Sequence, residues 1–453
     1  MDAKKSRIVV AFALSCLSIG AAAAPGADGP AAAARPTIVF ILADDLGRRD
    51  VGFMGGTEIK TPNLDKLAAA GARLDQFYVQ PVCSPTRCAL MTGRYPMRCG
   101  LQVGVIRPNA TYGLPLEERT LPQALREAGY TTAMVGKWHL GSFDKAYWPN
   151  ARGFDHWYGH LFGALDYFTH VRDGKLDWYR NGEPLAESGY TTNLLAAEAV
   201  RLVRAQPKEK PLFLYVAFNA VHAPHQVPPR YEEPYAHLTG VRRTYAGMVA
   251  AMDEAVGEIA AAIDETGRRA NTLFVFSSDN GGPNPGRVTD NGALRAGKGT
   301  LYEGGVRVCA FAAWEGRIVP GSVVGAPLHM VDWYPTLLKI AGASPDQRLP
   351  IDGRDAWAAI AEGKPSPRGE VLFNTTPRGG ALRIGDWKLV LAAPAAAPRK
   401  KKAPDAAVEL FNLRDDPGER ENLAAKLPEK VKELRARYDA LAKEAAAPRN
   451  AAE

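Results

Sequence analysis

The sequence predicts an α/β protein in which a mostly parallel sheet lies between helices and is followed by a small antiparallel sheet. The first observation behind this prediction is a set of four apolar runs separated by helical stretches, an alternation typical of parallel sheets covered on both faces. The second is a change after residue 345, where short strand-like runs follow one another at hairpin spacing. With 453 residues, the chain is long enough for two domains.

The four apolar runs are rich in β-branched residues, as expected of strands buried on both faces. Each ends in polar residues: Thr37–Leu42 in Asp44 and Asp45, Thr131–Val135 in Lys137 and His139, Leu212–Phe218 in Asn219 and His222, and Leu273–Phe276 in Asp279 and Asn280. Ligands of parallel sheets bind beyond the carboxyl ends of the strands. We therefore expect these polar side chains to meet at one site.

Helical patterns precede three of these strands, at Leu121–Ala128, Thr192–Ala205 and Tyr245–Thr266. In the third, Met248 and Met252 belong to an apolar stripe that indicates core packing rather than a binding surface. Four short runs predict the antiparallel sheet, namely Glu370–Asn374, Ala381–Ile384, Trp387–Leu391 and Val408–Phe411. An exposed loop is expected over Ala392–Asp405 and a terminal helix over Leu427–Ala445.

The N-terminus reads as a secretory signal, with basic residues at Lys4, Lys5 and Arg7, an apolar stretch over Ile8–Ile19 and small residues at Ala21–Ala24. We expect an exported protein, periplasmic or secreted, with no stable membrane span, because no later apolar segment is long enough. The predicted organisation is a signal peptide at 1–24, a disordered linker at 25–35, a main domain at 36–345, a small α+β subdomain at 346–445 and a tail at 446–453.

The formal net charge of +7 is partly local, because Arg399–Lys402 is a run of four cations. This pattern is weak support for anionic partners and argues against nucleic acid. Of the five cysteines, Cys16 lies in the signal segment, and the remaining four are too few for a disulfide scaffold. A Cys88–Cys99 pair in an exported protein stays open.

Asp44, Asp45, Asp279 and Asn280 offer hard oxygen ligands, with no His or Cys cluster at zinc-binding spacing. Two adjacent aspartates after a strand are often only a solvated turn. An Asp-Asn pair at the end of another strand favours a metal site instead, for Ca²⁺ or Mg²⁺ rather than structural zinc.

A short helix is predicted to start at Cys83 and to stop near Gly93, with Pro85 in its first turn. Cys83 would then lie where backbone N–H groups favour an anion, with Arg87 one turn further on. A buried, inert thiol is the simpler reading of a lone cysteine.

The four strand ends favour the reactive reading, because they bring further cations and imidazoles toward Cys83. Lys137 and Lys298 join Arg87 as cations, and His139 and His222 supply imidazoles. A divalent ion, these groups and a nucleophile are what transfer of an oxyanion group, sulfate or phosphate, requires.

Two stretches resemble the signatures of the formylglycine-dependent sulfatase family. The first is Cys83-Ser84-Pro85-Thr86-Arg87, continued by Leu90 and Thr92-Gly93-Arg94; the second runs from Gly129 through Gly136-Lys137-Trp138-His139-Leu140-Gly141. The resemblance covers residues 36 to about 425. It implies an alkaline-phosphatase-like α/β fold and a sulfuric ester hydrolase of the arylsulfatase type.

The resemblance further implies that a formylglycine-generating or sulfatase-maturing enzyme converts Cys83 to formylglycine, whose hydrate attacks sulfur. Ca²⁺, with Mg²⁺ as the alternative, would be held by Asp44, Asp45, Cys83, Asp279 and Asn280. Arg87 and Lys137 would steady the hydrate and the sulfate. Lys298 and His222 would bind the sulfate and assist the leaving alcohol, and His139 would take a proton from the second hydroxyl.

The implied substrate is a sulfated carbohydrate or an aryl sulfate. The alternative within the superfamily is a phosphonate monoester or phosphodiester hydrolase that uses the same modified cysteine; a non-catalytic binder of sulfated glycans would require a broken site. The sequence departs from the family pattern at Arg48, Arg49, His225 and the loop between Gly282 and Asn291. These are rim positions, so the departures bear on the substrate rather than on the reaction.

Overall fold

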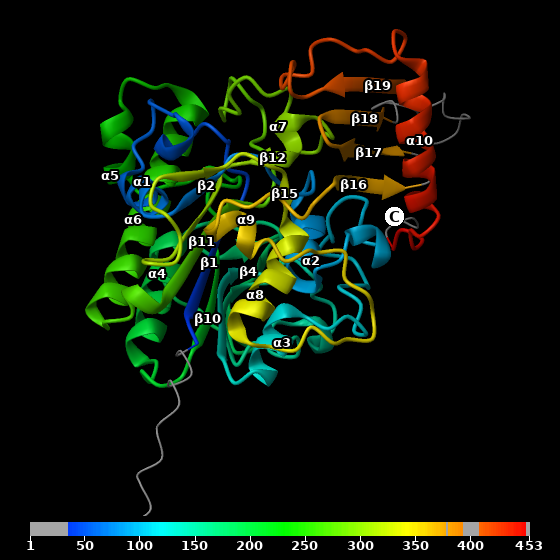
Figure 1. Cartoon of the computed structure of the whole chain (residues 1–453). Helices are drawn as coiled ribbons and strands as arrows, with labels where there is room; N and C mark the ends of the chain where they lie inside the picture. The colour runs from blue at the N-terminus through cyan, green and yellow to red at the C-terminus, as the bar shows by residue number, and fades with distance from the viewer. Residues whose placement is uncertain (1–34, 377–378, 393–406, 450–453) are drawn as a thin grey trace, which may run out of the picture. The chain divides into compact units, whose positions relative to one another are not determined.

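The computed structural model describes residues 35–376, 379–392 and 407–449 (Figure 1). These described residues form one compact unit. The predicted signal peptide and residues 25–34 of the predicted linker lie outside the described residues, as does most of the loop expected over Ala392–Asp405. Within the described residues, no helix combines the length and apolar character that a membrane crossing needs.

A ten-stranded sheet forms the centre of the molecule, in the order β14-β2-β13-β11-β1-β10-β4-β5-β8-β9. Its middle strands β11, β1, β10, β4 and β5 run parallel. The strands are β1 (Thr37–Ala43), β2 (Ala72–Leu74), β4 (Thr131–Lys137), β5 (His156–His160), β8 (Tyr179–Arg180), β9 (Glu183–Pro184), β10 (Leu212–Ala217), β11 (Thr272–Ser278), β13 (Ala310–Ala313) and β14 (Ser322–Val324). All four predicted buried strands are present, and the mostly parallel sheet is confirmed.

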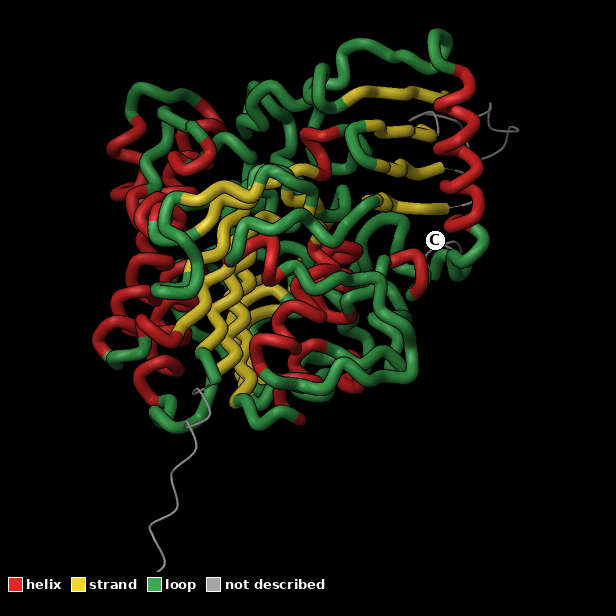
Figure 2. Tube along the Cα trace, in the orientation of Figure 1, coloured by secondary structure: helices red, strands yellow, loops and turns green. Residues whose placement is uncertain are grey.

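Helices cover both faces of this sheet (Figures 1 and 2). One layer holds α1 (Pro62–Ala69), α4 (Thr191–Ala205), α5 (Pro229–Glu232) and α6 (Gly240–Glu265); the other holds α2 (Cys83–Thr92), α3 (Leu121–Glu127) and α8 (Trp333–Ala341). Side chains alternate along β1, so Val39 and Ile41 join the core under α6 while Ile38 and Phe40 join the core under α8. The methionine stripe of α6 is buried in the first of these cores, as predicted.

Local signals explain where several helices begin and end. Thr120 and Gln123 form a reciprocal capping box at the start of α3. Gly93 ends α2 and Gly342 ends α8 in the left-handed conformation, with φ of 66° and 64°. Helix α6 starts at Gly240, five residues before the predicted Tyr245. The start was missed because residues 240–244 hold one apolar side chain, Val241, and so show no apolar periodicity.

The C-terminal part forms a four-stranded antiparallel sheet in the order β16-β17-β18-β19, covered by one helix. Its elements are β16 (Glu370–Thr376), β17 (Gly379–Ile384), β18 (Trp387–Ala392), β19 (Ala407–Asn412) and α10 (Pro428–Ala442). The predicted small antiparallel sheet and terminal helix are confirmed. The domain boundary between 345 and 346 stays a prediction.

Smaller elements complete the chain. They are β3 (Phe77–Tyr78), β12 (Arg307–Val308) and β15 (Leu328–His329) in a three-stranded sheet, the ribbon β6 (Val171–Arg172) and β7 (Lys175–Leu176), and the helices α7 (Glu303–Val306) and α9 (Trp357–Ala361).

Candidate active site

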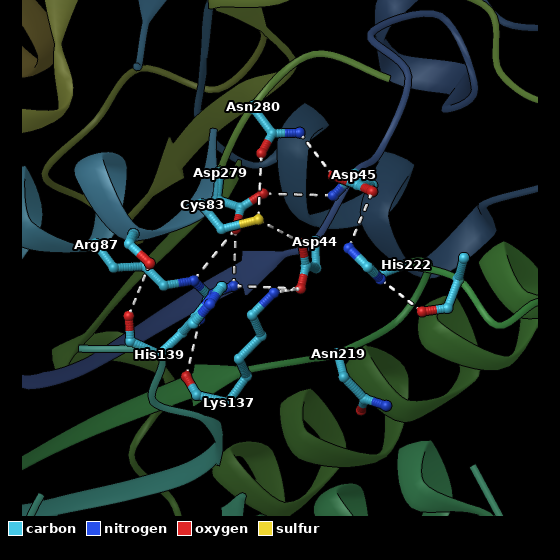
Figure 3. Close-up of polar contacts among 12 residues, drawn as sticks. Asp44, Asp45, Cys83, Arg87, Lys137, His139, Asn219, His222, Asp279 and Asn280 are labelled. Atoms are coloured by element: carbon cyan, nitrogen blue, oxygen red, sulfur yellow. Dashed lines mark hydrogen bonds and ion pairs between the residues drawn. The ribbon is translucent and has the colours of Figure 1, made fainter. Parts of the chain in front are cut away.

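Helix α2 places Cys83 at the carboxyl edge of the central sheet. Every side chain of α2 is buried, and Cys83 is 1% exposed. Its Sγ lies 3.3 Å from Oδ1 of Asp44 and 3.5 Å from Oδ1 of Asn280 (Figure 3). Burial raises the pKa of the Cys83 thiol well above its usual value, and Asp279 and Asp44 raise it further. The unmodified side chain is therefore a neutral thiol, a poor nucleophile at neutral pH.

The carboxylate and amide groups of the site follow two neighbouring strands. Asp44 and Asp45 follow β1, and Asp279 and Asn280 follow its parallel neighbour β11. The Asp45 backbone N–H donates to Oδ1 of Asp279 at 3.3 Å, and Nδ2 of Asn280 donates to Oδ1 of Asp45 at 2.7 Å. Asp45 adopts a left-handed backbone with φ of 66°. All four side chains are buried, so the cluster is a built site rather than a solvated turn.

Three cations neutralise this cluster. Arg87 donates to Oδ2 of Asp279 through Nε at 3.2 Å and Nη2 at 2.9 Å, and to the carbonyl oxygen of Lys137 at 2.8 Å. Lys137 forms an ion pair with Asp44, and Nζ of Lys298 lies 2.7 Å from Oδ1 of Asp45.

Burial alone would raise the pKa of Asp44. The nearby charges of Lys137, His222, Arg87 and Lys298 outweigh burial and hold it well below its usual range. Asp44 is therefore ionised at neutral pH and offers carboxylate oxygens as ligands.

His139 has one ring nitrogen engaged and one without a protein partner. Its Nε2 lies 3.0 Å from the carbonyl oxygen of Ile106, which can only accept, so Nε2 carries the proton. Its Nδ1 is buried and has no hydrogen-bond partner within the described part of the chain. Burial, followed by the charges of Lys137 and Arg87, lowers the pKa of His139 well below its usual value. The neutral ring thus presents a free lone pair at Nδ1.

His222 presents its other nitrogen to the site. Its Nδ1 donates to the carbonyl oxygen of Ala223 at 2.6 Å, and its Nε2 lies 3.6 Å from Oδ2 of Asp45 (Figure 3). Because the Ala223 carbonyl can only accept, Nδ1 carries a proton, and Nε2 is the nitrogen that faces the site.

The donor set suits a hard divalent cation. One ligand atom each from Asp44, Asp45, Cys83 and His222 lies within 4.8 Å of the others, and the amide oxygen of Asn280 points at the same Sγ. Carboxylate and amide oxygens are the ligands that Ca²⁺ and Mg²⁺ prefer. A position 83 that carried oxygen in place of sulfur would add another such ligand.

The structure brings together all ten residues singled out from the sequence: Asp44, Asp45, Cys83, Arg87, Lys137, His139, His222, Asp279, Asn280 and Lys298. The sequence reasoning did not single out Ser84, whose hydroxyl donates to the His139 carbonyl at 2.9 Å and accepts from the Ile106 N–H at 3.1 Å. Ser84 thus fixes the segment that holds His139, and its position next to Cys83 could have marked it as a site residue. The contact of His139 with the Ile106 carbonyl could not be predicted from the sequence, because every residue type has a backbone carbonyl.

Comparison with known proteins agrees with this geometry. Residues 36–343 match the family model described as Sulfatase. The chain is 38% identical to mouse arylsulfatase J, over 90% of this chain and 75% of the relative, and 36% identical to human arylsulfatase A, over 88% and 85%.

Solved structures show the same fold. The crystal structure of Ps i-CgsB in complex with k-i-k-neocarrahexaose superposes with a TM-score of 0.83 at 32% identity, over 91% of this chain and 94% of that one. The phosphonate monoester hydrolase of Agrobacterium radiobacter, at a TM-score of 0.64 and 21% identity over 89% and 96%, shares the fold alone. The chain therefore belongs to the formylglycine-dependent sulfatase family and is a sulfuric ester hydrolase.

Proposed function

We propose that this protein is an exported sulfatase that hydrolyses sulfate monoesters of carbohydrates, and aryl sulfates as small analogues, with Cys83 converted to formylglycine. The observation that carries the proposal is the position of Cys83 Sγ between the oxygens of Asp44 and Asn280, with the Arg87–Asp279 pair behind it. As the hydrated aldehyde, position 83 would supply the nucleophilic oxygen that the protonated thiol cannot. A formylglycine-generating or sulfatase-maturing enzyme is the partner this requires.

We infer that Asp44, Asp45, Asp279 and Asn280, with the modified residue 83, hold the metal ion, Ca²⁺ rather than Mg²⁺. An irregular set of buried carboxylate and amide oxygens suits the flexible coordination of Ca²⁺ better than the strict octahedron of Mg²⁺. When bound, the ion supplies electrostatic activation of the nucleophile and charge neutralisation at the sulfate.

The cations of the site position the sulfate and the nucleophile. Lys137 and Arg87 are fully buried, so their charges act at low effective dielectric, where they stabilise a developing negative charge strongly. Lys298, on the loop after β11, contacts Asp45 from the more exposed side of the site and is placed to meet a sulfate oxygen. Arg87 also fixes Asp279, which keeps that carboxylate oriented.

The two histidines would have different roles in proton transfer: His222 as the donor and His139 as the acceptor. Protonated at Nε2, His222 would donate a proton to the departing alcohol, because this nitrogen faces the site while Nδ1 is tied to Ala223. The free Nδ1 of neutral His139 would accept the proton from residue 83 that lets sulfate leave.

The finer substrate is also a proposal. Relatives named N-acetylgalactosamine-6-sulfatase and the neocarrahexaose complex favour a sulfated sugar of a polysaccharide. The stretches Asp166–His170 and Glu303–Arg307 resemble arylsulfatase B, the N-acetylgalactosamine-4-sulfatase, and this narrower resemblance stays a prediction.

The decisive experiment is mass spectrometry of the peptide that contains Cys83, from protein coexpressed with a sulfatase-maturing enzyme. Conversion of cysteine to formylglycine lowers the peptide mass, and the converted fraction should scale with 4-nitrophenyl sulfate turnover. Cys83→Ala should abolish turnover, whereas Cys309→Ala, a buried cysteine outside the site, is the matched control. Full activity with an unmodified Cys83 would refute the proposed nucleophile.

The alternative reaction is tested with the same protein. A phosphonate monoester or phosphodiester hydrolase would cleave phenyl phosphonates faster than aryl sulfates. We expect the reverse order of kcat/KM.

A further inference from the structure

A cavity of about 680 Å³ takes part of its lining from the segments that follow the same two strands as the proposed metal-ligating aspartates. One wall is the segment after Asp45 that contains Arg49, and another is the 282–291 loop after Asn280. The Arg49 backbone N–H donates to the carbonyl oxygen of Asp290 at 2.8 Å, which joins the two walls. Both walls are places where the sequence departs from the family pattern.

Arginines dominate the side chains of this cavity, which we call the arginine pocket: Arg49, Arg242 and Arg287, with His237 and Thr239 beside them. The charge of Arg242 is neutralised within the protein, since Arg242 forms ion pairs with Asp50 at 2.7 Å and with Glu58. Of the Arg49 guanidinium, only Nε has a partner in the described part of the chain, the Gly55 carbonyl at 3.2 Å. Arg287 is exposed, and within the described ranges its side chain has no hydrogen bond or ion pair; only its backbone N–H donates, to the Asn284 carbonyl at 3.1 Å.

The two acidic residues of the lining do not neutralise these free guanidinium groups. Glu58 accepts from Arg242, and Oδ1 of Asp290 accepts from the Gly292 backbone N–H at 2.7 Å. Helix α6 begins at Gly240 beside the pocket, without a side-chain cap and without an acidic residue in its first turn. Its N-terminus therefore adds positive potential to the two free arginines.

The pocket is connected to the candidate active site through Tyr245. The Tyr245 hydroxyl donates to Asp50 at 2.8 Å and accepts from the Gly47 N–H at 3.1 Å, and the Arg242 guanidinium lies 5.4 Å from its ring centre. On its other side, the ring packs against His225 at 6.1 Å. The Tyr245 ring is fully buried, and His225 is three residues beyond His222, so a chain of contacts beneath the surface joins Arg242 of the pocket to the segment that carries His222.

We propose that the arginine pocket binds an anionic group, sulfate or carboxylate, on a sugar neighbouring the one whose sulfate ester is hydrolysed. The proposal rests on the proposed function and deepens it, because it makes the substrate a polyanionic oligosaccharide or polysaccharide rather than an isolated sulfated sugar. Arg49 and Arg287 would contribute charge-assisted hydrogen bonds to that group.

The test compares the full chain with its R49A/R287A variant by isothermal titration calorimetry. The probes are hexasaccharides of carrageenan, chondroitin 4-sulfate, chondroitin 6-sulfate and heparin. The matched control is R204A/R317A, which removes the same charge from two exposed arginines outside the pocket, Arg204 in the last turn of α4 and Arg317 after β13. Turnover of 4-nitrophenyl sulfate is measured in parallel as the readout of the active site.

At least one hexasaccharide should bind the wild-type chain, and R49A/R287A should weaken its Kd by about tenfold or more, the size expected for the loss of two charge-assisted contacts. The control should change Kd less than twofold, and kcat/KM for 4-nitrophenyl sulfate should stay within twofold in both variants. Equal weakening in control and variant, no weakening, or no binding of any hexasaccharide to the wild type would overturn the pocket assignment. Loss of aryl sulfate turnover in the wild type would instead refute the proposed function, independently of the binding result.

Discussion

Arg87 shows how tightly stability and chemistry are coupled at the level of one residue. Its guanidinium and the Asp279 carboxylate are both buried, and removal of one partner leaves the other charge uncompensated. We expect Arg87→Met to lower the free energy of unfolding by about 3–5 kcal/mol. Adding Asp279→Asn should restore more than half of that loss without restoring turnover. Urea unfolding of the wild type, the two single variants and the double variant in EDTA measures these free energies without a bound cation. If the losses of the two single variants simply add in the double variant, the expectation is wrong.

Asp177 provides a pH prediction that is independent of the metal site. It is buried, and burial raises its pKa to about 6, although the backbone N–H groups of Leu161 and Phe162 lower it. Because the folded pKa lies above the unfolded value of about 3.9, the folded state binds more protons between these values, and stability falls as pH rises through this window.

The Asp177→Asn variant lacks this titration. Between pH 4 and pH 7, the wild type should therefore lose about 2–3 kcal/mol relative to the variant. Urea unfolding of both proteins at half-unit pH steps measures the difference. Parallel pH profiles would show that the carboxyl has an ordinary pKa in the folded state.

At the level of elements, α7 links the active-site loop to the C-terminal sheet. Lys388 of β18 is fully buried and pairs with Glu303 of α7 and with Glu419, each at 2.9 Å. Glu303 follows Lys298 by one short loop. Lys388→Met should lower the free energy of unfolding by about 3–5 kcal/mol, because two buried carboxylates lose their cation.

Lys388→Met should also raise KM for 4-nitrophenyl sulfate more than it lowers kcat, because the loop that carries Lys298 is anchored at Glu303, which would lose its ion pair. Lys364→Met, at an exposed ion pair with Glu362, is the control and should change neither quantity. If Lys388→Met destabilises the protein but leaves KM unchanged, the ion pairs of Lys388 do not position the active-site residues.

The strands differ in how well the amino-acid sequence predicted them. The buried strands β1, β4, β10 and β11 were predictable because they are apolar on both faces, and their polar ends located the candidate site. The outer strands β8, β9 and β14 are two or three residues long and carry no periodicity, so they depend on tertiary pairing alone. Contacts made by a backbone carbonyl, such as Ile106 with His139, leave no trace in residue identity.

The whole molecule shares its core between the predicted main domain and the C-terminal sheet. Tyr78 and Val306 of the main part pack in one cluster with Val371, Phe373 and other residues of the C-terminal strands. The chain end is tied back as well, since the Ala446 N–H donates to the Met97 carbonyl at 2.8 Å. Neither part buries its apolar surface alone, so they should unfold together.

Calorimetry of the full chain should therefore give one transition, with a calorimetric enthalpy close to the van't Hoff value. A chain that stops after Ala392 loses β19 and α10, which exposes the β18 edge and the apolar residues of the shared cluster. We expect that truncated protein to aggregate or to lack a cooperative transition, even though every proposed active-site residue lies before residue 299. A shorter truncation after Arg449, the last described residue, is the control and should melt like the full chain. Two separate transitions in the full chain, or a folded and active protein ending at Ala392, would show that the C-terminal sheet is an independent domain.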